Sequence, residues 1–234
     1  RLRAKLADLK AAGVEGSVIQ GLESDVKRLT DNLTGLDTLV NNRLIVGERK
    51  KVLLSEAVQA AAAVQQLLAP WSAVMDQAIA QWRRSKFNPR VPQTQREEVD
   101  AQFEKSLGWL RALQTSQVTA SNVSDLLQRA SAADTDSSVR VAGFRLQQAL
   151  SELERLASDF DPRLRSLMIE AITKLRLFAV GNDSVPALRL REIASIVDGT
   201  KLLSENAALS NGLTSKVASL TVAASKDITD ANAK

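Results

Sequence analysis

The stretch GLESDVKRLTDNLTGLDTLV, residues 21–40, decides the fold class. Its apolar residues recur in steps of four and three, which is the heptad pattern of a helix packed along another helix. They are Leu22, Val26, Leu29, Leu33, Leu36 and Val40. The pattern predicts a long helix whose apolar stripe lies in the core of a bundle.

The stripe is interrupted at VNNRLIVGERKK, residues 40–51, and then resumes through Leu54 to Leu68. It keeps its phase across Pro70, so we expect one kinked helix over 17–83 rather than two helices. Asn41, Asn42 and Arg43, together with Gly47, are expected to form either a polar layer that sets register or a signalling hinge.

One short helix is expected before this long helix, and several shorter helices and a second long helix are expected after it. The expected ranges are 1–12, 94–113, 121–130, 139–160, 162–178 and a final long helix over 184–231. Their limits come from Thr94 with Glu97 as a capping box, Ser121 as a cap, Asp161 before Pro162, and Gly181 as a stop. The sequence therefore predicts an all-α, elongated antiparallel bundle, residues 1–234 forming one domain of two stacked modules that share long helices.

Composition excludes several classes of protein. The chain has 0 His and 0 Cys, which removes His-based and Cys-based catalysis and most zinc and haem sites. We expect no cofactor, no metal and no catalysis in this chain. With 31 basic residues, 27 acidic residues and 3% aromatics, the surface does not suit nucleic-acid binding. The sequence contains no run of about 18 uninterrupted apolar residues, so no membrane span is expected within this chain.

Three segments together resemble the periplasmic sensor domain of trimethylamine-N-oxide-type hybrid sensor histidine kinases, a family of helical bimodular sensor domains. They are LTDNLTGLDTLVNNRLIVGERKKVL (residues 29–53), FDPRLRSLM (160–168) and VGNDSVPALRLREIASIVDGTKLLSENAALSNGL (180–213). The resemblance implies a periplasmic domain of a bacterial inner-membrane protein, held between transmembrane helices outside this sequence, with a cytoplasmic kinase.

The resemblance further implies a homodimeric receptor that senses a small ligand directly or through a periplasmic binding protein. Output would pass through displacement of the C-terminal helix. In that family the first helix is long, whereas 1–12 is short, so we expect part of the first helix to precede Arg1. Two alternatives stay open: the ligand-binding domain of a methyl-accepting chemotaxis receptor, and a cytoplasmic coiled-coil adaptor.

Five arginines are candidate ligand-binding or partner-binding residues, because the planar guanidinium group can hold a carboxylate through two parallel hydrogen bonds. They are Arg43, Arg49, Arg145, Arg189 and Arg191. Arg189 and Arg191 oppose the dipole at the start of the final helix, and an anion or carboxylate there would relieve this conflict. The alternative is that each arginine forms a surface pair with a neighbouring Glu.

Overall fold

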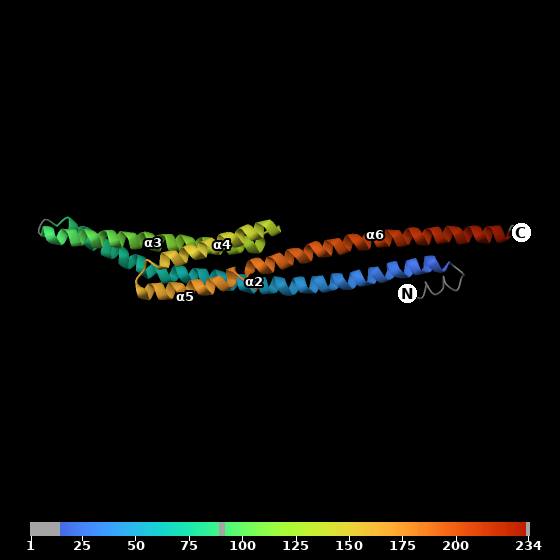
Figure 1. Cartoon of the computed structure of the whole chain (residues 1–234), viewed down its shortest axis with the longest axis horizontal. Coiled ribbons are helices and arrows are strands. Elements are labelled where there is room, and N and C mark those ends of the chain that lie inside the picture. Colours follow the sequence, from blue (N-terminus) through green and yellow to red (C-terminus); the bar gives the residue numbers. More distant parts are fainter. Residues whose placement is uncertain (1–14, 89–91, 233–234) are drawn as a thin grey trace. The chain divides into compact units, whose positions relative to one another are not determined.

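The computed structural model describes residues 15–88 and 92–232. In these residues the chain forms five α-helices and no strand (Figure 1). The helices are α2 (Gly16–Lys86), α3 (Gln93–Ala132), α4 (Asp136–Ala157), α5 (Pro162–Ala179) and α6 (Val185–Asn232). The all-α helical bundle is confirmed, whereas the helix expected at 1–12 lies outside the described residues.

Helix α2 is continuous over 71 residues and contains Pro70 in its interior. The apolar stripe does keep its phase there: Leu68 is fully buried, and Trp71 and Met75 pack against the same core. Asn41, Asn42 and Arg43 are exposed, so the prediction that they form a polar layer in the core is wrong.

Helix α3 differs from the expectation in two places. It begins at Gln93 after Pro92, without a side-chain capping hydrogen bond from Pro92, and the side chain of Thr94 lies outside what the structure describes. It also runs without a break through Ser121, so the separate helix expected at 121–130 is wrong. The reason is packing: Ser116, Ala120 and Val123 are all buried, and their burial favours a helix across a stretch rich in Ser and Thr.

The turns between the later helices follow local sequence signals. The Thr135 side chain accepts a hydrogen bond from the Ser138 amide and caps α4. Asp161 accepts from the amides of Arg163 and Leu164 at 2.9 and 3.1 Å, and Pro162 takes the first helical position of α5. Gly181, with φ of 105°, adopts the left-handed conformation that a residue with a Cβ rarely enters.

The chain divides into two compact units, each of which contains part of α2 and part of α6. Unit 1 is Arg1–Leu44 with Ala194–Lys234, and unit 2 is Ile45–Ile193. The expected stacking of two modules stays a prediction.

Unit 2 holds one hydrophobic core to which all of its helices contribute. Short turns join α3 to α4 and α4 to α5, and these neighbours pack against each other as antiparallel pairs (Figure 1). The largest fully buried side chains of this core are Val64, Leu68, Leu113, Leu127, Leu146, Leu150, Leu153, Leu164, Met168, Ile172 and Leu175. Most of the heptad stripe predicted for 139–160 is buried, namely Val139, Leu146, Leu150, Leu153, Ala157 and Phe160.

Unit 1 is an antiparallel pair of helices, formed by the first part of α2 and the last part of α6. The direction follows from three neighbours: Asp25 pairs with Lys216, Asn32 with Glu205, and Gly35 lies against Leu202. As the residue number increases along α2, the number of the neighbouring residue on α6 decreases, so the two helices are antiparallel.

The predicted core stripe of unit 1 is only partly correct. Leu22 is buried, but Leu33 and Val40 on α2 are 57% and 55% exposed. On α6, Val197, Leu203 and Val217 of the predicted stripe are likewise exposed. The heptad pattern contains two adjacent apolar stripes: on α2, Leu22 is buried and Leu29 and Leu36 are half-buried, whereas the stripe of Leu33 and Val40 is exposed.

By length and composition alone, α2 passes the test for a helix that could cross a membrane, with a window of mean hydropathy 1.3. Core helices of soluble proteins pass the same test, and Leu53, Ala57 and Val64 of α2 lie in the core of unit 2. This observation is weak evidence for a membrane span.

The continuity of α3 can be tested at Ser121, an exposed residue. Ser121→Pro should lower the free energy of unfolding by about 3 kcal/mol or more, because proline in a helix interior removes a hydrogen bond and clashes with the preceding turn. Ser121→Ala is the control and should be neutral or slightly stabilising. Urea unfolding followed by circular dichroism measures both; a tolerated proline would mean that a helix does begin at Ser121.

Candidate functional site

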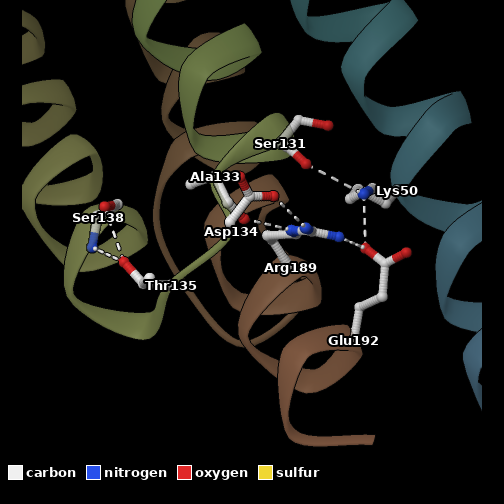
Figure 2. Close-up of polar contacts among 8 residues, drawn as sticks. All are labelled: Lys50, Ser131, Ala133, Asp134, Thr135, Ser138, Arg189 and Glu192. Carbon is white, nitrogen blue, oxygen red and sulfur yellow. Dashed lines mark hydrogen bonds and ion pairs between the residues drawn. The ribbon is translucent and has the colours of Figure 1, made fainter. Parts of the chain in front are cut away.

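The last carbonyl groups of α3 have partners from two other helices. The carbonyl groups at the end of any helix lack partners within it, and α3 ends at Ala132 with Ala133 in an extended conformation. Lys50 Nζ, on α2, donates to the Ser131 carbonyl oxygen at 3.1 Å, and Arg189 Nε, on α6, donates to the Ala133 carbonyl oxygen at 2.8 Å (Figure 2). The positive charges of both side chains also interact favourably with the negative end of the α3 dipole.

Glu192 lies between these two cations and compensates their charge. Its Oε2 atom accepts from Lys50 Nζ and from Arg189 Nη1, each at 2.6 Å. The side chains of Lys50, Arg189 and Glu192 are only 12–13% exposed. We call these three side chains, with the Ser131 and Ala133 carbonyl groups, the Arg189 network.

The ionisation of Glu192 reflects this enclosure. Burial raises the pKa of its carboxyl group, but the hydrogen bonds from Lys50 and Arg189 and their positive charges outweigh burial and hold the pKa below its usual value. Glu192 is therefore a carboxylate at neutral pH.

The conflict expected between Arg189 and the α6 dipole is relieved within the chain. Arg189 lies in the first turns of α6, where a positive charge is unfavourable. Glu192, three residues further on, supplies the carboxylate, and Asp134 adds a longer contact of 3.8 Å. Arg189 thus matches neither sequence-based alternative in full, because its partner is a neighbouring Glu but the pair is largely buried.

An open groove adjoins the Arg189 network at the turn from α3 to α4. Its volume is about 670 Å³. The lining residues with polar side chains are Arg129, Asp134, Thr135, Ser137, Ser138 and Arg145. Ala133 and Asp134 belong to the rim of the groove and also contact Arg189, so the groove and the network share one segment of chain (Figure 2). We call this surface the α3–α4 groove.

The five predicted arginines are distributed as follows. Arg189 lies in the network, and Arg145 lines the α3–α4 groove. Arg191 is half exposed; it donates to the Asn182 carbonyl oxygen and lies 3.5 Å from Asp183. Arg43, in unit 1, and Arg49, in unit 2, are exposed. Of the predicted set, only Arg189 and Arg145 border the same turn.

Lys50, Glu192 and Arg129 were not predicted from the sequence. Glu192 follows Arg189 by three residues, a spacing that places two side chains together on a helix, and this signal could have found it. Lys50 is 142 residues from Glu192 and one of several cations in GERKK, so no local pattern selects it.

The α3–α4 groove presents side chains that can form hydrogen bonds with a ligand. Two guanidinium groups, three hydroxyl groups and the carboxylate of Asp134 line the groove, and the guanidinium groups are the ones that could bind a small anion. Among the residues that the structure describes, no cluster of His, Cys, Asp and Glu could hold a metal ion. No protein-family model, curated protein or solved structure matches this chain.

Arg189→Ala should lower the free energy of unfolding by about 2 kcal/mol, because the Ala133 carbonyl group loses a charged donor and Glu192 loses one of two partners. Arg191→Ala, two residues along the same helix and half exposed, is the control and should cost about 0–1 kcal/mol. Urea unfolding at neutral pH compares them. Equal losses for the two variants would contradict a structural role for the network.

The contribution of Glu192 to stability should disappear in acid. Its folded pKa lies below the unfolded value of 4.5, so the stabilisation is complete above that pH and declines as the pH falls through the folded pKa. The stability difference between the native chain and Glu192→Gln should therefore be constant from pH 6 to 8 and shrink below about pH 4.5. Urea unfolding at each pH measures it, with Glu104→Gln on the exposed surface as control; a difference that persists unchanged at low pH would contradict the assignment.

Proposed function

We propose that this chain is the extracytoplasmic sensor domain of a membrane-bound sensor histidine kinase. It would be the periplasmic domain of a bacterial inner-membrane protein. The observation that supports this most is α6, a single helix of 48 residues that begins beside the Arg189 network and continues to Asn232. The three sequence segments that resemble such sensors agree with it.

Helix α6 has the properties that a transmitting element needs. Ser184 caps its start, donating to the Gly181 carbonyl oxygen at 2.7 Å and accepting from the Ala187 amide at 3.4 Å. Its only proline, Pro186, is in the first turn, where proline is tolerated. A helix without an interior break can carry a shift of about 1–2 Å along its length, which is the usual size of helix shifts in switching.

The α3–α4 groove is the proposed receiving site, and a small anionic ligand or an acidic surface of a periplasmic binding protein is the proposed partner. Arg129 and Arg145 would hold its carboxylate or phosphate group through paired hydrogen bonds. Because Ala133 and Asp134 connect the groove to Arg189, a ligand that moves this segment changes the contacts of the first turns of α6. Catalysis would belong to the kinase domain elsewhere in the protein.

The full-length receptor in membrane vesicles tests this, with autophosphorylation as the readout and a panel of small dicarboxylates and inorganic phosphate as probes. At least one probe should change the output. Arg129→Ala with Arg145→Ala should weaken that response about tenfold or more, since a charged hydrogen bond contributes roughly 1.5–3 kcal/mol. A Gly-Ser-Gly insertion after Val217 should preserve probe binding and abolish the response.

Arg140→Ala is the matched control, because Arg140 lies on α4 but pairs with Asp136 outside the groove. It should respond as the native receptor does. An unchanged response in the groove variant would move the ligand site elsewhere, and an unchanged response after the insertion would mean that α6 is not the transmitter. The gene itself separates the alternatives: a methyl-accepting coiled coil downstream would indicate a chemoreceptor, and the lack of any apolar span on either side would indicate an adaptor.

A further inference from the structure

The helix pair of unit 1 has very little core to hold its two helices in register. The pair is formed by 16–44 of α2 and 194–232 of α6. Among the described apolar side chains of these segments, only Ile19 and Leu22 are buried, and both lie near the start of α2. A dense core fixes the relative position of helices because many side chains interdigitate. Over the rest of this pair, the register therefore depends on a few specific contacts.

The polar contacts of the pair constrain the register only loosely. Lys216 Nζ pairs with Asp25 Oδ2 at 2.6 Å, but a lysine carries its charge on a flexible four-carbon stem that can follow a moving partner. Asn32 Nδ2 donates to Glu205 Oε2 at 3.5 Å, which is long for a hydrogen bond. Neither contact would by itself resist a shift of α6 along α2.

One apolar contact is tighter, and it holds a leucine against a glycine. Gly35 on α2 has no Cβ, and a Cβ added there would lie 3.2 Å from Leu202 Cδ1 on α6. Carbon atoms in favourable contact are about 3.5–4.0 Å apart, so a larger residue fits at position 35 only if Leu202 moves. Glycine thus allows the Leu202 side chain to approach the backbone of α2 closely.

A second leucine and glycine meet at the same level, with the roles of the two helices exchanged. Leu36, the next residue on α2, lies against Gly199 on α6, where an added Cβ would be 3.9 Å from Leu36 Cδ2. This distance is ordinary van der Waals contact, so the contact is looser than the one at Gly35. Each helix therefore places one leucine where the other helix has no side chain.

Each helix has one glycine in this part of the sequence. Gly35 is the one glycine of α2 between Gly21 and Gly47, and Gly199 is the one glycine of α6 before Gly212. A glycine in a helix interior weakens the helix relative to alanine, because the glycine backbone loses more freedom on folding. Its presence at both leucine contacts indicates that close approach of the two helices offsets this cost.

These contacts exist in one register of the pair. Sliding α6 along α2 by one turn, about 5.4 Å, would break both of them. Leu202 would then meet Asp31 or Leu39, whose side chains occupy the space that is open at Gly35. Interlocked side chains give discrete arrangements rather than a continuous range, and helices pass from one to another in steps of a turn. The pair therefore has one favoured register, and intermediate positions are crowded.

We propose that the seating of Leu202 on Gly35 is a register lock, which holds the two helices of unit 1 at one axial position. While the lock is closed, α6 cannot slide along α2, so a displacement of α6 carries the first part of α2 with it. The moving element is then the helix pair rather than α6 alone. The lock does not depend on the proposed sensor function, whereas the use of the pair as the transmitting element rests on it.

Distances between spin labels in the purified chain, measured by double electron–electron resonance, test the lock. The chain has 0 Cys, so Thr38→Cys with Ser219→Cys gives two unique attachment sites, both at exposed positions of unit 1. The register places Thr38 beside Gly199, so the labels are separated mainly along the helix axis, by roughly 30 Å over about 20 residues. The labelled chain should give one distance peak, and a slide of one turn would move that peak by about 5 Å.

Gly35→Leu fills the seat and should replace the native peak with one displaced by about 5 Å, because Leu202 and the new side chain cannot share the space. The matched control is Gly212→Leu, since nothing lies within 4 Å of a Cβ added there. It should keep the native peak. Both substitutions replace glycine with a strong helix former, so both variants should remain helical by circular dichroism.

Leu202→Ala removes the other half of the lock and should broaden the native peak to include the shifted register. Leu209→Ala is its matched control, because Leu209 is also half-buried and lies one heptad further along α6, where the register places no glycine opposite it. It should leave the peak narrow.

The proposal is overturned if the native chain already shows two registers, if Gly35→Leu keeps the native peak, or if Leu202→Ala leaves that peak as narrow as Leu209→Ala does. Loss of the native peak in either control would also overturn it, because the effect would then not belong to the contact between Leu202 and Gly35. These measurements need neither ligand nor kinase, so their failure leaves the sensor proposal to its own test.

Discussion

Helix α3 needs hydrogen-bond donors for its last carbonyl groups, and much of unit 2 is organised around meeting that need. No glycine follows α3 to fold the chain back and supply its own amides. Lys50 from α2 and Arg189 from α6 supply the donors instead, and two cations in a partly buried place need a carboxylate, which is Glu192. The hydrogen bonds that satisfy the end of α3 thus connect it to α2 and α6.

The position of this junction matters for the proposed signalling role. The capped carbonyl groups of Ser131 and Ala133 lie at the turn that forms the α3–α4 groove, and Arg189 lies in the first turns of α6. A ligand that prefers one arrangement of this turn would bias the contacts of Arg189 by its difference in affinity for the two arrangements, and by no more than that. Arg145 contributes charge to the groove, whereas Arg189 is already engaged by Glu192 and the Ala133 carbonyl group.

The all-α class and the later turns could be predicted because their signals are local. Asp161 before Pro162 and the glycine at 181 act through the backbone of a few residues. The break expected at Ser121 was wrong because a capping residue type is only a weak preference, and burial of neighbouring side chains overrides it. Leu33 and Val40 show a different limit: a heptad pattern identifies apolar stripes but not which stripe a single copy buries. Lys50 with Glu192 could not be predicted, because a contact over 142 residues requires the tertiary fold.

The uneven distribution of buried side chains along α2 and α6 has a consequence for how these helices open. Each helix is continuous in sequence and hydrogen bonding, yet its residues in unit 2 pack on a dense core while those in unit 1 bury little. Amide protons exchange with solvent through local opening, and the free energy of opening follows packing rather than helix length. A single helix would then show two exchange regimes, with slow amides before Ala194 on α6 and faster ones after it.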